Sequence, residues 1–203
     1  MTPEAPTAAV RRGGRVGALL LALLAASSCG RSAPPPVLGT LPPFALTERT
    51  GAAVGADDLR GRVWIADFVF TSCPDVCPAL TKRMAGLQAP LAAGADPVQL
   101  VSFSVDPTHD TPAILREYAD RHGAGAHWSF LTGSREAVVA LLRDGFRVAF
   151  ADDGPPSAPI THSDRFVLVD RQLRVRGYYH GSDPADIERL VADARRVRDE
   201  PAA

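Results

Sequence analysis

The sequence predicts a three-layer α/β fold, in which a central mixed β-sheet is flanked by helices on both faces. Apolar, strand-like runs alternate with segments of helical periodicity from residue 63 to residue 145. The chain then continues with two strand-like runs around a short turn and one last helix, so part of the sheet is expected to be antiparallel. With 203 residues, 46% of them hydrophobic, the chain is long enough for one such domain plus tails.

The elements of the first half carry most of this prediction. Residues 44–47 and the turn at 51–55 indicate a short strand or hairpin. The near-continuous apolar run at 63–70 is typical of a strand that is covered on both faces, and helical spacing follows it at 78–91. A second buried strand is expected at 98–105.

The second half continues the alternation and then changes to antiparallel strands. Thr111 and Pro112 suit the N-cap and the first position of a helix, and Ser134 suits the N-cap of a third helix that ends near residue 145. The segment 152–159 is dense in Pro, Gly and Asp and is expected to be a loop. Two antiparallel strands and a closing helix complete the prediction, at 165–170, 174–179 and 184–197.

Two cysteines stand where the first buried strand gives way to a helix. Cys73 and Cys77 are separated by three residues, whereas a redox-active dithiol of the thioredoxin kind has two residues between its cysteines. Four residues along a helix advance about 6 Å and return to nearly the same face, so both sulfurs can meet one ion or each other. A reactive site that opens the first helix of such a sheet favours a thioredoxin-like arrangement.

Soft sulfur ligands select Cu(I), Zn(II) or iron–sulfur clusters, and the number of further ligands decides among them. Structural zinc requires four ligands and a cluster usually four cysteines, whereas the predicted domain contains only two. The pattern therefore favours Cu(I), with a histidine imidazole as the third ligand.

One of the five histidines is placed differently from the others. His122, His127 and His180 have the positions of ordinary surface or packing residues. His162 ends the Pro-rich loop and precedes the strand at 165–170, which in a thioredoxin-like sheet lies next to the strand of the cysteines. A single histidine at a strand start is more often structural than a ligand, so these residues alone leave both readings open.

Two aspartates near the thiols also have two readings. Asp75 lies between the cysteines, where it could tune the charge of the site or contact a partner, or only cap the helix. Asp106 begins an Asp-Pro turn after the second buried strand, where it could support the site, contact a docking partner, or simply form the turn.

The N-terminal 28 residues are predicted to be a signal peptide. Three arginines precede the apolar run 16–26, which is too short to span a bilayer comfortably, and Ser27-Ser28-Cys29 follows. Small residues before a cysteine are typical of a bacterial lipoprotein, in which Cys29 carries the lipid; a signal cut without lipidation and an uncleaved anchor are the alternatives. We therefore expect an extracytoplasmic domain, on the periplasmic side, that is anchored to the cell membrane.

The remaining chain divides into a Pro-rich linker at 29–43, a copper-binding domain at 44–197 and a flexible tail at 198–203. The net charge of −1 excludes an electrostatic case for nucleic-acid binding.

The sequence resembles the Sco/SenC family of copper chaperones over roughly residues 36–197. The resemblance depends on FTSCPDVCP at 70–78, on SFSVDP at 102–107 with DTP at 110–112, and on HS at 162–163 before FVLVD at 166–170. It implies a membrane-tethered, thioredoxin-like domain that binds one copper ion, as Cu(I) and also as Cu(II), through Cys73, Cys77 and His162. The chain departs from the family pattern at His109, where Arg or Lys is common, and at its lipid anchor, where many relatives have a transmembrane helix.

The implied partner is the copper-receiving subunit of cytochrome c oxidase, whose dinuclear copper centre the family helps to assemble. Other copper chaperones or a thiol reductase are further partners. The alternative function is an extracytoplasmic thiol:disulfide oxidoreductase, in which Cys73 attacks and Cys77 resolves the mixed disulfide. A peroxiredoxin-like peroxidase is disfavoured, because that class places Thr three residues before its cysteine and Thr71 is two residues before Cys73.

Overall fold

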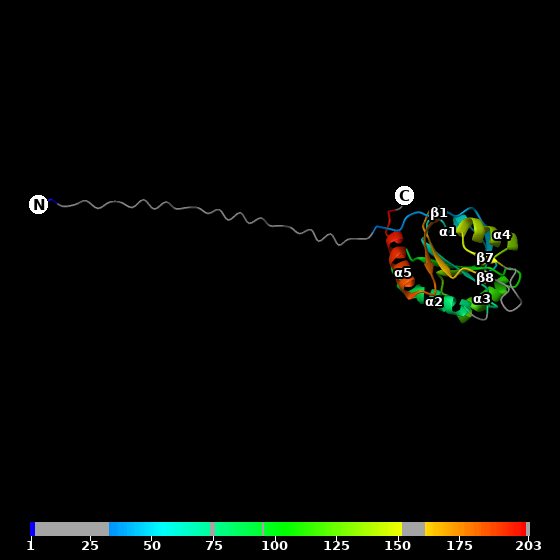
Figure 1. Ribbon diagram of the computed structural model, residues 1–203. Coiled ribbons are helices and arrows are strands. Elements are labelled where there is room, and N and C mark those ends of the chain that lie inside the picture. Colours follow the sequence, from blue (N-terminus) through cyan, green and yellow to red (C-terminus); the bar gives the residue numbers. More distant parts are fainter. Residues whose placement is uncertain (3–32, 74–75, 95, 152–160, 202–203) are drawn as a thin grey trace. The chain divides into compact units, whose positions relative to one another are not determined.

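A computed structural model describes residues 1–2, 33–73, 76–94, 96–151 and 161–201. At residues 76, 77, 161 and 162 it describes the backbone and not the side chains. The predicted signal peptide with Cys29, the predicted loop at 152–159 and Asp75 lie outside the described residues. The chain from Ala33 onward forms one compact unit (Figure 1).

The middle layer of this unit is an eight-stranded mixed sheet, as predicted. Its strands are β1 (Gly39–Thr40), β2 (Ala45–Glu48), β3 (Ala53–Gly55), β4 (Trp64–Val69), β5 (Gln99–Ser104), β6 (Trp128–Thr132), β9 (Arg165–Val169) and β10 (Arg174–His180). Their order across the sheet is β1-β10-β9-β4-β5-β6-β2-β3. The central strands β4, β5 and β6 are parallel, whereas β9, β10 and β2 pair antiparallel with their neighbours.

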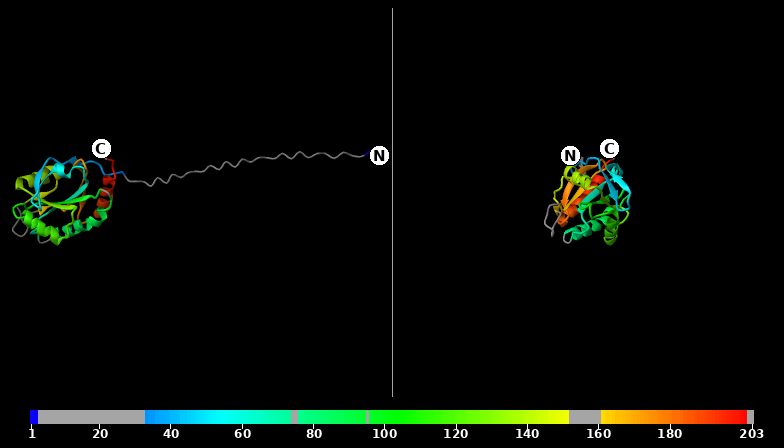
Figure 2. Two further views of the ribbon diagram at one scale, coloured as in Figure 1. Left: turned by 180° about the vertical axis from the view of Figure 1, so that it is seen from behind. Right: turned by 90° about the vertical axis from the view of Figure 1, so that its right-hand side faces the viewer.

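Helices cover both faces of the sheet. They are α1 (Ala56–Leu59), α2 (Val76–Leu91), α3 (Pro112–Arg121), α4 (Arg135–Ala140), the π-helical segment η1 (Leu141–Phe146) and α5 (Pro184–Arg198). Helices α2, α3 and α5 lie on one face of the sheet, and α1 and α4 lie on the other (Figures 1 and 2). Buried side chains of α2, α3 and α5 belong to one core cluster, and those of α1, α4 and η1 belong to the other. Thr111 and Ser134 accept the N-capping hydrogen bonds that the sequence predicts, from the N–H groups of Ile114 and Ala137.

Strand β4 explains how one apolar run serves two cores. Alternate side chains of a strand point to opposite faces, so Trp64, Ala66 and Phe68 join the core under α1 and α4. Ile65 joins the core under α2, α3 and α5. The strand is buried along its whole length, which accounts for the near-continuous apolar run in the sequence.

The fold starts earlier than the boundary at residue 44 that we predicted. Strand β1 lies within the range assigned to the linker and pairs with β10, and Leu41 is only 4% exposed. Proline-rich segments give no periodic hydrophobic signal, and a two-residue strand is too short to supply one.

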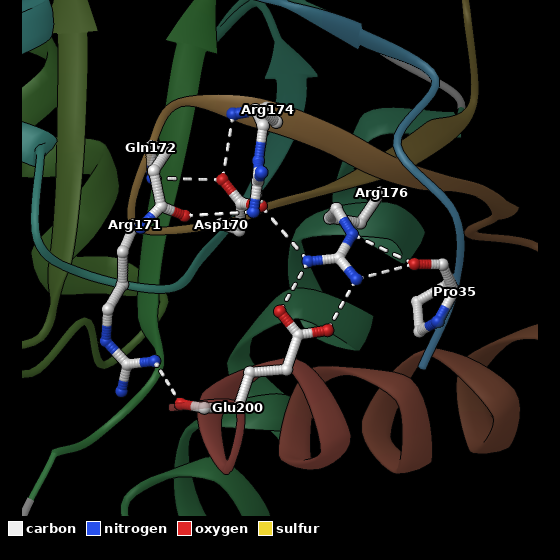
Figure 3. Close-up of polar contacts among 7 residues, drawn as sticks. All are labelled: Pro35, Asp170, Arg171, Gln172, Arg174, Arg176 and Glu200. Carbon is white, nitrogen blue, oxygen red and sulfur yellow. Dashed lines mark hydrogen bonds and ion pairs between the residues drawn. The ribbon is translucent and has the colours of Figure 1, made fainter. Parts of the chain in front are cut away.

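A buried ionic cluster holds both ends of the domain together. The Arg176 guanidinium, 5% exposed, donates to the Pro35 carbonyl at 2.6 and 2.9 Å, to Asp170 at 3.1 Å and to Glu200 at 2.5 and 2.8 Å. Arg174 also pairs with Asp170, at 2.7 Å (Figure 3). Glu200 lies in the predicted flexible tail, yet its side chain is fixed here. The cluster follows β9, at the end of the sheet opposite to Cys73, so the chain enters the domain far from the thiols.

Candidate metal site

The two cysteines lie on either side of the joint between β4 and α2. Cys73 follows a turn in which its N–H donates to the Phe70 carbonyl at 3.2 Å. Cys77 is the second residue of α2, as predicted, in the first turn where backbone N–H groups have no partner within the helix. That the helix dipole favours the thiolate of Cys77 at this position stays a prediction.

The Cys73 side chain is half-buried and is not in a disulfide. It packs against the core cluster under α1 and α4, and Val148, Phe150 and Tyr178 pack against the same cluster. Cys73 therefore lies on the sheet face that the segment after η1 also covers.

His162 precedes strand β9, as expected, but it lies in a short strand that we did not predict. It belongs to β8 (Thr161–His162), which pairs with β7 (Phe150–Ala151) in a separate two-stranded sheet. Phe150 is the register partner of His162 and packs on the same core cluster as Cys73. The next strand, β9, does lie beside β4, as predicted. The fold thus places the strand partner of His162 on the same core cluster as the Cys73 side chain, although Cys73 and His162 are 89 positions apart in sequence.

The side chains of Cys77 and His162 lie outside the described residues, so the closure of a three-ligand site is not described. Within the described part of the chain, no three His, Cys, Asp or Glu side chains form a metal-binding group. The chemistry of the predicted ligands suits Cu(I), because two thiolates and one imidazole are soft and intermediate ligands. The Cys73 side chain, half-buried and without a disulfide, is compatible with that role.

A buried carboxylate, Asp110, fixes the loop that leads to Cys73. It is 0% exposed and accepts hydrogen bonds from the Thr71 hydroxyl at 2.5 Å, the Thr71 N–H at 3.1 Å and the Ser104 hydroxyl at 2.7 Å. Thr71 stands two residues before Cys73, so the loop after β5 holds the cysteine loop in place. No role for Asp110 was predicted from the sequence.

His109 is attached to the same carboxylate. Its Nδ1 lies 3.0 Å from Asp110 Oδ1, and the hydrogen bond raises the pKa of the imidazole above its ordinary value, with a further contribution from Asp106. Because a carboxylate can only accept, Nδ1 carries the proton. The ring is half exposed, so the residue that departs from the family pattern is held at the rim of the cysteine loop.

Asp106 forms the turn that carries His109 and Asp110. Its carbonyl accepts from the N–H groups of His109 at 3.1 Å and Asp110 at 2.8 Å, and its own N–H donates to the Ser104 hydroxyl. The turn-forming reading of Asp106 is thus visible in the structure, while a role in docking stays a prediction.

A second buried carboxyl, Asp67, was also missed. It lies in β4 on the face covered by α2, is 1% exposed, and neither oxygen has a hydrogen-bond partner. Burial raises its pKa from 3.8 to about 7, and the neighbouring Ser102 hydroxyl opposes this shift. That hydroxyl accepts a hydrogen bond from Trp128 at 2.9 Å. The sequence did contain a signal, because Asp67 is the one charged residue in the apolar run 63–70.

The other histidines have structural contacts. The His122 ring lies 4.5 Å from that of Tyr118, the His127 ring lies 3.3 Å from the Gln99 side chain, and His180 lies 3.2 Å from Asp164. Among the described residues no helix is long and apolar enough to cross a membrane.

The solved structures that this chain resembles include several Sco-family proteins. A SCO1/SenC family lipoprotein of Bacillus anthracis is 34% identical, with a TM-score of 0.72 over 79% of this chain and 96% of its own. BsSco, a member of the Sco family of cytochrome c oxidase assembly proteins in which a disulfide switch was identified, is 29% identical, with a TM-score of 0.73 over 84% of this chain and all of its own. ScoI of Bradyrhizobium japonicum, solved with copper bound, is 27% identical, with a TM-score of 0.66 over 78% of this chain and 99% of its own.

These neighbours agree with the thioredoxin-like α/β fold described above. The SCO1/SenC family itself matches residues 35–198, which include β1, both cysteines, His162 and α5. The chain belongs to the SCO1/SenC family.

Proposed function

We propose that this protein is a copper chaperone that carries one copper ion on Cys73, Cys77 and His162 and helps to assemble the dinuclear copper centre of cytochrome c oxidase. The observation that carries the proposal is that Cys73, at the β4–α2 joint, and Phe150, the strand partner of His162, pack against the same core cluster. It agrees with the copper bound by the Bradyrhizobium relative and with the oxidase assembly ascribed to BsSco.

The chemistry requires a reduced cysteine pair. Two thiolates and an imidazole hold Cu(I), and a partner with similar ligands can take the ion by exchanging one ligand at a time. Cu(II) is a second cargo that the imidazole would help to hold. A disulfide between Cys73 and Cys77 would remove two of the three ligands, so copper binding and thiol oxidation exclude each other.

Anaerobic titration of the reduced protein with Cu(I), against a competing chelator, tests the ligand set. We expect one equivalent of Cu(I) to bind tightly, and His162→Ala to weaken binding by more than about 100-fold. Even the loss of a residue that only hydrogen-bonds to a metal ligand lowers metal affinity by about 10- to 100-fold. The double variant Cys73→Ser/Cys77→Ser should lose tight binding altogether. His127→Ala is the matched control, because His127 contacts Gln99 and is not a predicted copper ligand. This variant should bind Cu(I) like the wild type. Equal affinities for wild type and His162→Ala would refute the ligand assignment.

A second candidate function is thiol:disulfide exchange on the cysteines of a copper-site partner. The free thiol of Cys73 at the end of a strand and the disulfide switch in BsSco favour it. In this case His162→Ala should leave exchange with a model disulfide largely intact, while Cys73→Ser abolishes it.

The location follows from the predicted N-terminal segment. We propose an extracytoplasmic protein that is anchored to the membrane through a lipid on Cys29, in agreement with the lipoprotein nature of the Bacillus anthracis relative.

A further inference from the structure

A hollow of about 690 Å³ adjoins the β7–β8 pair. Ser163, which directly follows His162, lines it, and the Ser163 N–H donates to the Ala149 carbonyl at 3.1 Å. Tyr178 and His180 of β10 line it as well. The hollow therefore borders the chain segment that directly follows His162.

Two arginines that line this hollow, Arg147 and Arg165, make no hydrogen bond or ion pair with any residue that the structure describes. Arg147 is exposed and Arg165 is half-buried. Asp186, whose pKa is lowered first by the hydrogen bond from the His180 N–H, is also within electrostatic reach of Arg165. One carboxylate, Asp164, also lines the hollow, and it contacts His180 at 3.2 Å and accepts from Ser182 at 2.8 Å. The described lining thus carries two arginines against one aspartate, a positive excess, although the whole chain has a net charge of −1.

The backbone of Arg147 is in the left-handed region, with φ of 53° and ψ of 40°. This is the position after a helix end where glycine is the usual residue, because side chains adopt it at a conformational cost. Arginine here holds a guanidinium near β1, about 4.0 Å from the place of a Cβ at Gly39.

Apolar and aromatic surface lies beside the two charges. Leu38 lines the hollow and is 46% exposed; apart from it, only Met1 and Val37 are exposed among the large apolar residues of the described chain. The Tyr178 ring is half-buried, and its hydroxyl donates to the Phe146 carbonyl at 2.9 Å. Arg, Tyr and an exposed apolar side chain around one hollow are typical of the centre of a protein interface.

From these observations we infer that the hollow is the docking surface for a carboxylate-bearing segment of the protein that receives copper from this chain. A guanidinium matches a carboxylate in a two-pronged hydrogen bond, and two unpaired guanidinium groups fit an acidic segment better than any other protein surface. The inference rests on the proposed function, because it names the partner of the same site.

A charge-reversal experiment tests the inference. The double variant Arg147→Glu/Arg165→Glu is titrated with the reduced, copper-free copper-receiving domain of the oxidase subunit from the same organism, at low and at high salt. We expect its affinity at low salt to be at least about tenfold weaker than that of the wild type, and the difference to shrink at high salt. Arg62→Glu is the control, because Arg62 is exposed and precedes β4 at the end of the sheet opposite to Cys73. This control should bind like the wild type.

Cu(I) affinity, measured on each variant without the partner, separates the two proposals. It should be equal in all of them, because the substituted arginines are not ligands. An unchanged partner affinity in the double variant, or a wild type that does not bind the domain at low salt, overturns the docking surface. Failure of the wild type to bind Cu(I) instead overturns the proposed function.

Discussion

Asp67→Asn should be almost free of a pH effect that the wild type shows. Between about pH 4 and pH 8 the free energy of unfolding of the wild type should fall by about 4 kcal/mol because of Asp67. The pKa of Asp67 is raised from 3.8 to about 7 by burial, and each unit of pKa difference between the folded and unfolded states is worth about 1.4 kcal/mol. Below pH 4 the carboxyl is protonated in both states. As the pH rises to about 7, only the unfolded chain releases this proton, so the free energy of unfolding falls.

Chemical denaturation at a series of pH values measures this effect. Asparagine has nearly the shape of a protonated aspartate and stays neutral, so the variant should lack the Asp67 part of the pH dependence. The Asn side chain also lacks hydrogen-bond partners at this buried place, so the informative quantity is the difference between pH 4 and pH 8 within each protein. Asp120→Asn, at an exposed position of α3, is the control and should keep the wild-type pH dependence. If Asp67→Asn and the wild type have parallel pH profiles, the carboxyl is not held protonated by burial.

Arg176→Met should lower the free energy of unfolding by about 3 kcal/mol at pH 7, because removal of one member of a buried ion cluster leaves uncompensated charge. Met keeps much of the side-chain volume but loses all five hydrogen bonds to Pro35, Asp170 and Glu200. Arg174 still pairs with Asp170, so the cost should be at the lower end of the range for buried pairs.

Denaturant unfolding with matched variants tests this prediction. Arg143→Met removes an exposed ion pair with Asp144 and should leave stability nearly unchanged. Arg176→Lys keeps the charge but not the planar fork, so its stability should lie between those of wild type and Arg176→Met. A loss below about 1 kcal/mol for Arg176→Met would mean that the cluster contributes no more than a surface pair.

The layered architecture could be predicted because its main elements carry strong periodic signals. The run 63–70 and helix α2 follow from hydrophobic pattern alone, and the caps Thr111 and Ser134 were identified from side-chain chemistry. The strands β1, β7 and β8 could not be predicted, since each has only two residues and depends on its pairing partner. For the same reason the position of His162 within a strand of its own was not predicted.

The environment of the thiols was less accessible to sequence reasoning than the thiols themselves. Cys73 and Cys77 were conspicuous through their spacing, but the clamp between Thr71 and Asp110 joins residues 39 positions apart. Asp67 could have been found, because a charge inside a run buried on both faces requires an explanation. The unpaired guanidinium groups at Arg147 and Arg165 could not, since partners are visible only in the folded chain.

The most direct test of the account is copper K-edge X-ray absorption of the Cu(I)-loaded, reduced protein, compared with the same measurement on His162→Ala. We predict two sulfur donors and one nitrogen donor in the wild type, and loss of the nitrogen donor alone in the variant. A wild-type spectrum with sulfur donors only, or identical spectra for the two proteins, would contradict the claim that a histidine of β8 completes the site formed by Cys73 and Cys77.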